Sequence, residues 1–195
     1  MIRTIETDFF GANVYLIHRN GHYCLIDCGG TPEFLLKVLG EITPEYILLT
    51  HGHIDHILSL DALWQRYRPK VVIDRQDLAF LRDPSLNLSQ RLCGFPFIFS
   101  ESCMLPEAAQ QDLQMRILPT PGHTPGSVTY LFDHDAFTGD TMFQNGIGST
   151  DFPLGDLSKE TKSIQRLLSL PPETAVYPGH GAATTIAAER KYHLL

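Results

Sequence analysis

Short apolar runs separated by turn-forming residues dominate the first half of the chain. Two of these runs flank Asn20-Gly21, a dipeptide that supplies the positive φ angles of a tight hairpin turn, so the chain is expected to begin with antiparallel strands. A helix follows, because Thr31 can cap its first turn, Pro32 fits its first position and Gly40 ends it. The pattern predicts strands over 13–17, 23–26, 46–49 and 70–73, and helices over 32–39, 57–67 and 76–81.

The pattern is lost between residues 83 and 106. This stretch has three prolines and no clear period, which is typical of a long functional loop or lid. Its aromatic residues, Phe95, Phe97 and Phe99, allow two interpretations. They could line a hydrophobic pocket for an acyl group, or they could pack against the body of the protein or a dimer partner.

Strands and helices alternate again after this loop. The sequence predicts strands over 115–118, 128–132, 136–138 and 174–177, and helices over 159–168 and after 184. Strand pairs followed by helices thus occur in both halves, without an internal sequence repeat. This order favours an α/β protein with two sheets face to face and helices outside, a four-layer αββα sandwich. With 195 residues, the chain is expected to form a single catalytic domain over 1–195.

Composition and charge narrow the expected partners. Hydrophobic residues make up 43% of the chain and charged residues 19%, which is ordinary for a globular protein. The formal net charge is −7, from 15 Lys and Arg against 22 Asp and Glu, and no basic tract is present. We therefore expect a small-molecule substrate, and neither a nucleic-acid partner nor a membrane surface.

The N-terminal residues and the cysteines indicate a cytoplasmic protein. Residues 1–8 contain two acidic residues and lack the continuous apolar stretch of a secretory signal. Cys24, Cys28, Cys93 and Cys103 show no Cys-x-x-Cys spacing, so we expect reduced thiols. Cys28 lies near the candidate site in sequence, but it lacks a partner at ligand spacing and is interpreted as a small packing residue.

Four ionisable residues follow the predicted strand 46–49 within a few positions of one another. They are His51, His53, Asp55 and His56, and a core would not tolerate so many such groups unpaired. Imidazole and carboxylate are the ligands of zinc and neighbouring transition metals, and this spacing can serve two adjacent metal positions. A polar loop that is rich in histidine by chance is the alternative.

Three later residues have a similar setting. His123, Asp140 and His180 each follow or end an apolar strand, and each is framed by glycine or proline. Any one of them alone could simply form a turn or cap. Together with the upstream cluster they become candidate ligands. Asp27 is a candidate supporting carboxylate, placed to fix the tautomer of a ligand histidine or the metal loop, with a simple turn-closing role as its alternative.

The His-x-His-x-Asp-His run, with its later Gly-His, Gly-Asp and Gly-His elements, resembles the metallo-β-lactamase superfamily, and most closely its glyoxalase II-like branch. The resemblance extends from Leu25 to Arg190 and implies the metallo-β-lactamase fold. It also implies a site with two divalent metal ions, zinc first, with iron or manganese as alternatives. By this resemblance the first metal is held by His51, His53 and His123, and the second by Asp55, His56 and His180, with Asp140 bridging both.

The resemblance implies hydrolysis of a thioester or a related small acyl ester, as in hydroxyacylglutathione hydrolases, through a metal-bound hydroxide. Asp55 would be both a ligand and the catalytic group that orients this hydroxide. The alternative is a persulfide dioxygenase with a single iron held by two histidines and a carboxylate. A β-lactamase is disfavoured, because Asp140 stands where those enzymes carry another residue. A catalytically inactive binding module is disfavoured because all seven ligands are present.

Two departures from the glyoxalase II pattern are apparent. Those enzymes continue into a helical domain that contacts glutathione, whereas this sequence ends at Leu195, so we expect a compact form with weak recognition of glutathione. Relatives also read Gly-Arg-x-Asp after the bridging aspartate, whereas this chain reads Gly148-Ser149-Thr150-Asp151. The loss of that arginine removes a planar bidentate donor.

Overall fold

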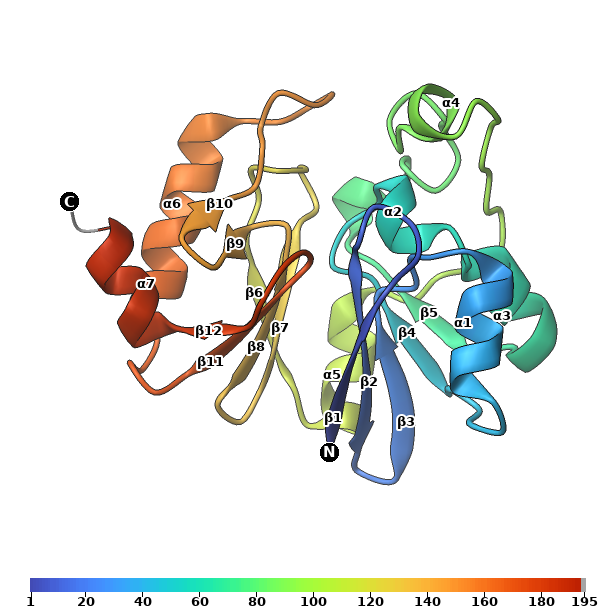
Figure 1. The fold of residues 1–195 in the computed structure, drawn as a ribbon, viewed down its shortest axis with the longest axis horizontal. Coiled ribbons are helices and arrows are strands. Elements are labelled where there is room, and N and C mark those ends of the chain that lie inside the picture. Colours follow the sequence, from blue (N-terminus) through green and yellow to red (C-terminus); the bar gives the residue numbers. More distant parts are fainter. Residues whose placement is uncertain (194–195) are drawn as a thin grey trace.

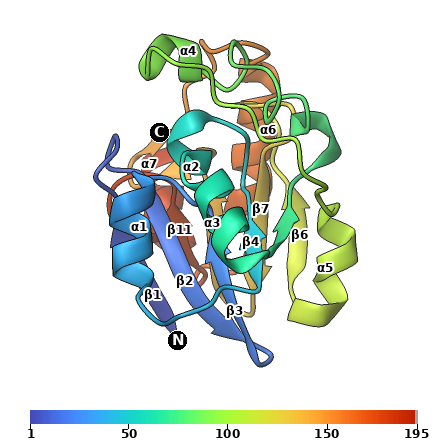
Figure 2. The same ribbon diagram turned by 90° about the vertical axis from the view of Figure 1, so that its right-hand side faces the viewer.

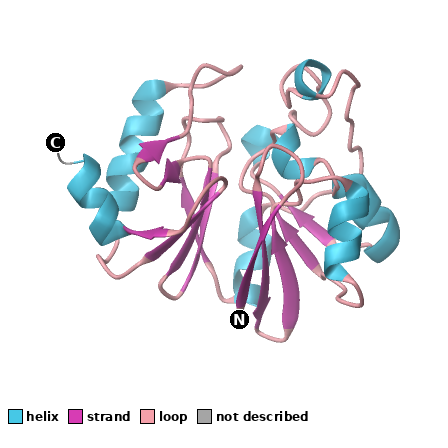
Figure 3. Ribbon diagram, viewed as in Figure 1, coloured by secondary structure: helices cyan, strands magenta, loops and turns pink. Residues whose placement is uncertain are grey.

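The computed structural model describes residues 1–193 and shows two β-sheets packed face to face, with helices on both outer sides (Figure 1). The four-layer αββα sandwich predicted from the sequence is confirmed. Colouring by secondary structure separates the layers, since the strands lie centrally and the longer helices flank them (Figure 3).

The first half of the chain forms a sheet of five strands. They are β1 (Ile2–Glu6), β2 (Asn13–Arg19), β3 (His22–Ile26), β4 (Tyr46–Leu48) and β5 (Lys70–Val72). The strands lie side by side in sequence order, antiparallel from β1 to β3 and parallel from β3 to β5. Asn20 and Gly21 have φ of 49° and 86° in the turn between β2 and β3, as the hairpin prediction required.

The second half forms the other five-stranded sheet and a small hairpin. The sheet contains β6 (Arg116–Pro119), β7 (Val128–Phe132), β8 (Asp135–Gly139), β11 (Ala175–Pro178) and β12 (Thr184–Thr185). The hairpin consists of β9 (Met142–Phe143) and β10 (Gly146–Ile147). The strand order is β12-β11-β8-β7-β6, and β8 and β11 are parallel.

Four helices cover the outer faces of the sheets (Figure 1). α1 (Pro32–Leu39) and α3 (Leu60–Tyr67) lie on the first sheet, and α6 (Leu157–Leu168) and α7 (Ile186–His193) on the second. α5 (Pro106–Leu113) lies along β6 at the edge of the sandwich (Figure 2). The short helices are α2 (Ile54–Ile57), α4 (Ser89–Leu92) and the 3₁₀ turn η1 (Arg75–Asp77). Within residues 1–193, no helix has the length and apolar character needed to cross a membrane.

Hydrophobic clusters fill the spaces between the layers, and the alternation along β2 shows how the sequence produces them. Leu16 points into the cluster beneath α1 and α3, whereas Tyr15 and Ile17 point into the cluster between the sheets. Successive side chains of a strand face opposite sides, so each strand of the first sheet contributes to two cores. The third cluster joins the second sheet to the helices α6 and α7 and contains Met142, Ile164, Leu167, Val176 and Ile186.

The predicted helix over 57–67 is wrong in its first part, because the structure has two helices there, α2 and α3. Ser59 explains the break. Its backbone N–H donates to the carbonyl of Cys28 at 3.0 Å, and its hydroxyl donates to the carbonyl of Gly30 at 2.8 Å. These bonds tie the chain to the loop after β3 between the two helices. The predicted helix over 76–81 is also wrong, since hydrogen bonds three residues apart make η1 and further turns instead.

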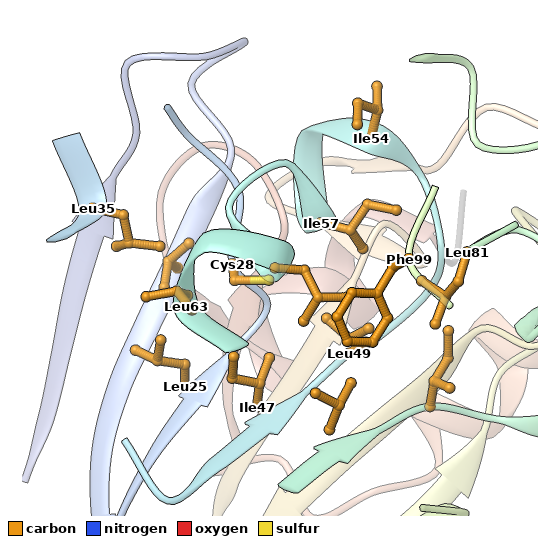
Figure 4. Packing of buried hydrophobic residues seen from close by; sticks show 14 of the residues in the cluster. Leu25, Cys28, Leu35, Ile47, Leu49, Ile54, Ile57, Leu63, Leu81 and Phe99 are labelled. Carbon is orange, nitrogen blue, oxygen red and sulfur yellow. The ribbon is translucent and has the colours of Figure 1, made fainter. Parts of the chain in front are cut away.

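The segment 83–106 is a packed part of the molecule. Phe99 is 1% exposed and lies with Ile57 and Leu81 in the core beneath the helices (Figure 4). Phe97 belongs to the same cluster, whereas Phe95 is 50% exposed. The packing interpretation of these aromatics is therefore correct for Phe97 and Phe99. Cys28 is fully buried in this cluster too, in agreement with its predicted packing role.

Candidate metal centre

The site lies where the carboxyl ends of parallel strands from both sheets meet, at the edge of the sandwich that carries α2 (Figure 1). His51 and His53 lie in the loop after β4, and Asp55 and His56 lie on α2. The end of a buried strand fixes the backbone position, and the short helix then turns the next two ligand candidates back toward the same point. One continuous stretch of sequence thus supplies four polar groups to one side of the site.

The second sheet supplies the other three groups. His123 lies in the loop between β6 and β7, Asp140 directly follows β8, and His180 follows β11. The structure therefore brings together all seven of the predicted site residues from five loops and helices. Their ligand atoms form two groups, in each of which all atoms lie within 4.8 Å of one another. The groups are His51, His53 and His123, and Asp55, His56, Asp140 and His180.

Asp140 lies between the two groups. Its Oδ2 is 3.6 Å from Nε2 of His123 in the first group, and its Oδ1 is 3.2 Å from Nε2 of His56 in the second. Oδ2 is also 3.7 Å from Nε2 of His180. A carboxylate whose oxygens lie near both groups has the placement that a bridging ligand requires.

The hydrogen bonds of three histidines fix their tautomers. Nδ1 of His56 donates to Oδ2 of Asp27 at 2.9 Å, and Nδ1 of His123 donates to the backbone carbonyl of Ser149 at 2.7 Å. Nδ1 of His51 lies 3.1 Å from the hydroxyl of Thr50, which donates its own proton to Asp27 and so accepts from His51. Each Nε2 is thereby left with a lone pair that faces the centre of the site.

Buried polar atoms without partners indicate that the site is built for cations. Nε2 of His51, Nε2 of His56 and Oδ1 of Asp140 are buried and make no hydrogen bond with any residue in 1–193. Nε2 of His53 is buried and without a partner among the described residues as well, while its Nδ1 hydrogen-bonds to Nε2 of His123 at 2.8 Å. Unpaired buried groups of this kind are costly, and a cation removes the cost for all of them. Three imidazoles in one group and a mixture of carboxylates and imidazoles in the other fit a pair of divalent transition metals.

The electrostatics of the two groups differ. Burial lowers the pKa of His51 well below its ordinary value and that of His53 to about 3, with the neighbouring histidines adding to the effect. Both are therefore neutral at physiological pH, as a metal ligand must be. Burial also disfavours the charged form of His56, but the carboxylates of Asp140 and Asp55 outweigh it and raise its pKa. The second group thus attracts positive charge strongly.

Two glycines allow the ligand loops to approach one another. A Cβ on Gly179 would overlap the Asp140 carboxylate and crowd the ring of His56. A Cβ on Gly148 would overlap the backbone carbonyl of Asp140. Position 179, directly before His180, therefore requires a residue without a side chain. The same holds for position 148, in the turn that brings the carbonyl of Ser149 to His123.

Asp27 occupies the supporting position expected from the sequence. It follows β3 with φ of 59°, a conformation that aspartate tolerates better than most residues. Besides the bond from His56, it accepts hydrogen bonds from the backbone N–H and the hydroxyl of Thr50, at 2.7 and 2.8 Å. The side chain thus connects the ligand helix α2 to the loop that begins at Thr50.

Asp77 is a supporting residue that the sequence did not reveal. It is fully buried and accepts hydrogen bonds from the backbone of Gly52 at 3.0 Å, from the hydroxyl of Thr124 at 2.7 Å and from the backbone of Gly126 at 2.7 Å. It therefore ties the His51–His53 loop of one sheet to the His123 loop of the other. Burial raises the pKa of Asp77 to about 6, against the effect of these hydrogen bonds. Nothing in the sequence distinguishes Asp77 from its polar neighbours at positions 74–76.

Glu160 on α6 is the second such residue. It is buried, and its Oε2 accepts a hydrogen bond of 2.9 Å from the backbone N–H of His123. Burial raises the pKa of this carboxyl to about 8. A signal was present in the sequence, since Glu160 shares the helix face of Ile164 and Leu167, which belong to the core.

A cavity of about 510 Å³ opens onto the two groups of ligands. Asp55, His123, Asp140 and His180 form its floor. None of Phe95, Phe97 and Phe99 lines it, so the pocket interpretation of these residues is wrong. The other lining residues are Phe10, Arg91, Leu92, Phe143, Ser149 and Phe152.

Histidines outside the site do not extend it. His18 and His134 are exposed, and His22 and His193 are half-buried at positions away from the cavity. His22 pairs with Glu45, and Nε2 of His193 lies 3.7 Å from Glu189. Residue type alone does not separate these four histidines from the five of the site, whereas the setting at the strand ends does.

Comparison with known proteins agrees with this geometry. YqgX of Bacillus subtilis, a probable metallo-hydrolase, is 35% identical over 188 residues, which cover 92% of this chain and 89% of YqgX. The hydroxyacylglutathione hydrolase GloC of Haemophilus influenzae is 36% identical over 182 residues, which cover 86% of this chain and 84% of GloC.

Two solved structures have nearly the same fold. The BLEG-1 B3 metallo-beta-lactamase superposes with a TM-score of 0.90 at 34% identity, over 98% of this chain and 97% of that one. TTHA1623, solved in a di-iron-bound form, gives a TM-score of 0.89 at 32% identity, over 99% of this chain and 100% of that one. Residues 7–180 match the metallo-beta-lactamase superfamily, so the fold, the paired ligand groups and the relatives together establish that this chain belongs to that superfamily.

Proposed function

We propose that this protein is a dinuclear metal-dependent hydrolase that cleaves a thioester or a related small acyl ester. The observation that carries the proposal is the pair of ligand groups that share Asp140 and form the floor of one cavity. His51, His53 and His123 would hold one divalent ion, and Asp55, His56 and His180 the other, with Asp140 between them. Zinc fits these ligands best, and the di-iron form of TTHA1623 makes iron the principal alternative.

Two such ions, when bound, would polarise a carbonyl and lower the pKa of the attacking water toward about 7. The protein's own contribution is to hold the ligands in place and to manage the proton. Asp55 borders the cavity, and its Oδ2 lies 3.1 Å from Nε2 of His180. Burial raises the pKa of Asp55, but the neighbouring His56 outweighs this and lowers it, so the carboxylate is charged. It can therefore orient the attacking water and accept its proton.

The cavity lining favours water as the nucleophile. Among the described residues, Ser149 is the one lining residue with a hydroxyl. Its Oγ donates to Asp151 at 3.3 Å and makes no hydrogen bond with a described histidine. Cys28 is buried, and burial raises the pKa of its thiol well above the ordinary value. Neither residue has the environment of an activated nucleophile.

The substrate class rests on the relatives and on the cavity. GloC is a hydroxyacylglutathione hydrolase, and a small cavity with apolar walls above the ligands suits an acyl group. A second candidate is β-lactam hydrolysis, which the similarity to BLEG-1 favours. A third candidate is a persulfide dioxygenase with a single iron, which the similarity to ETHE1 of Myxococcus xanthus favours, at a TM-score of 0.73 and 28% identity.

The test is metal analysis of protein purified without added metal, followed by assays with a substrate panel. The panel contains S-lactoylglutathione, simple acyl thioesters, lactones and β-lactams, and sulfide-dependent oxygen uptake is measured in parallel. We expect thioester hydrolysis that is lost on chelation and regained with zinc. Turnover of β-lactams alone, or oxygen uptake without hydrolysis, would overturn the proposal.

A further inference from the structure

Arg91 is the one Lys or Arg among residues 1–193 that lines the cavity over the ligand groups. It lies on α4, is exposed, and makes neither an ion pair nor a side-chain hydrogen bond with any residue in 1–193. The protein as a whole carries a net charge of −7, so a positive group at this mouth is not part of a general basic surface. An unpaired guanidinium at the entrance of a cavity is a ready donor for a carboxylate.

The backbone that carries Arg91 is held rigidly. Asn87 is fully buried, and its side-chain amide donates to the carbonyls of Phe80 at 2.8 Å and Phe97 at 3.1 Å. Its Oδ1 accepts from the backbone of Ser89 at 2.9 Å, and the hydroxyl of Ser89 accepts from the backbone of Phe97 at 2.9 Å. This buried network closes the turn on which α4 stands.

The same segment is connected directly to the candidate metal ligands. The backbone N–H of Ile54 donates to the carbonyl of Asn87 at 2.8 Å, at the start of the helix that carries Asp55 and His56. The position of α4 relative to the ligands is therefore fixed by main-chain and buried side-chain bonds. A side chain presented in this way can select a substrate with little loss of backbone entropy.

Apart from Ser149, the remaining walls of the cavity are apolar. Leu92 follows Arg91 on α4, and the ring of Phe152 packs against the rings of His53 and His123 with centroids 5.4 and 5.9 Å away. Phe143 approaches His180 from the other side, with centroids 6.1 Å apart. The cavity therefore combines an apolar surface close to the ligands with one positive charge at its mouth.

We propose that Arg91 determines specificity by binding a carboxylate of the substrate. The preferred substrate is then a thioester or ester with an apolar acyl part and an anionic group on the leaving side. This inference rests on the proposed hydrolysis. Metal ions at the floor of the cavity would themselves attract the carboxylate of a substrate. Arg91 at the mouth competes for that carboxylate, so the substrate enters with its carbonyl toward the metal ions.

The experiment compares two substrates that differ only in charge, 3-(acetylthio)propanoate and 3-(acetylthio)propanamide. We expect zinc-loaded wild-type protein to favour the carboxylate in kcat/KM by about tenfold, the effect of one hydrogen-bonded charge pair. Arg91→Ala should abolish this preference, mainly through KM, and leave the amide within about twofold. Arg91→Lys should keep part of the preference, because it retains the charge without the bidentate geometry. The matched control is Arg82→Ala, which changes an exposed arginine just before residue 83 that does not line the cavity.

Binding is measured separately from turnover, so that the role of Arg91 and the proposed hydrolase activity are tested independently. Calorimetric titration with the ketone analogue 3-(2-oxopropylthio)propanoate, which cannot be hydrolysed as a thioester, should give weaker affinity in Arg91→Ala by about tenfold. Equal affinity and an unchanged carboxylate preference in Arg91→Ala would overturn the role of Arg91. Absence of turnover for both thioesters would overturn the proposed function instead, and the titration would still decide the inference.

Discussion

Asp27 accepts a hydrogen bond of 2.9 Å from Nδ1 of His56, and the two side chains are 2% and 0% exposed. The bond turns Nε2 of His56 toward Asp140 and leaves it with a lone pair for a cation. The same carboxylate accepts both bonds from Thr50, so one buried side chain sets the ring of one candidate ligand and the start of the loop that carries two others.

Replacing Asp27 should weaken metal binding without removing a ligand. In the wild type, Oδ1 of Asp27 accepts from the backbone of Thr50, and Oδ2 accepts from the hydroxyl of Thr50 and from His56. The amide in Asp27→Asn has a single acceptor oxygen and cannot accept all three bonds. The ring of His56 therefore loses its fixed orientation. Loss of such a supporting carboxylate typically costs about 10- to 100-fold in metal affinity. Zinc titration with a competing chelator measures it, and Asp61→Asn, an exposed aspartate on α3, is the control. Wild-type affinity in Asp27→Asn would show that the bond is incidental.

The two ligand groups predict two bound divalent ions per chain at saturation. His123→Ala should lose mainly the ion of the first group, and His180→Ala mainly that of the second. Mass spectrometry of the metal content, after equilibration with zinc and gel filtration, measures both. His134→Ala, which changes an exposed histidine in a turn, should retain the wild-type content. Binding of a single ion by saturated wild-type protein would contradict the dinuclear site.

Asp55→Asn should keep part of the metal and lose most of the turnover. An amide is a weaker ligand than a carboxylate and cannot accept a proton from the attacking water. Removal of such a group typically lowers the rate by about 10² or more. Steady-state kinetics on the best thioester, with metal content measured on the same samples, separates lost chemistry from lost metal. Near wild-type kcat in the metal-loaded variant would leave Asp55 with a structural role only.

The sandwich and the clustering of the candidate ligands could be predicted from the sequence because both depend on short-range patterns. The short apolar runs around Asn20-Gly21 and before His51 are typical of buried strands in a packed sheet. Glycine or proline marks the strand ends where the candidate ligands lie. The same reasoning misses α5, because Ala109 and Leu113 alone give its buried face little periodic signal. It also misses β1, where Ile5 is the one fully buried residue of the strand.

Supporting residues are harder to predict because their role depends on contacts between distant parts of the chain. Asp77 meets Thr124 and Gly126 across the interface of the two sheets, 47 and 49 positions away. Asp27 could be assigned because it directly follows a buried strand and stands two residues before Gly29, in a setting like that of the ligands. Tertiary packing also decides the segment 83–106, since the burial of Phe99 depends on Leu81 and α2, which local periodicity does not describe.

The packing of this segment predicts a large difference between two phenylalanines. Phe99→Ala should destabilise the protein by about 3 to 5 kcal/mol, because it removes a fully buried ring from the core in Figure 4. Phe95→Ala, at a ring that is 50% exposed, should change the free energy of unfolding by less than about 1 kcal/mol. Urea denaturation of both variants measures the difference. Similar, small effects would mean that 83–106 is a loosely attached lid after all.

Asp77 should make stability depend on pH in an unusual direction. Burial raises the pKa of its carboxyl to about 6 in the folded protein, whereas an unfolded aspartate has a pKa of about 3.9. Between these values the folded state holds a proton that the unfolded state has released, so the contribution of Asp77 to stability is greatest below about pH 4. It falls as pH rises and is lost above about pH 6.

The variant Asp77→Asn isolates this effect, because an amide does not titrate. The free energy of unfolding of the wild type, minus that of Asp77→Asn, should fall by about 3 kcal/mol from pH 4 to pH 7, as two units of pKa imply. Urea denaturation of chelator-treated protein at several pH values measures this difference, and subtraction removes the titration of the histidines that both proteins share. A difference that stays constant or rises with pH would mean that the hydrogen bonds from Gly52, Thr124 and Gly126 outweigh burial and keep Asp77 charged in the folded protein.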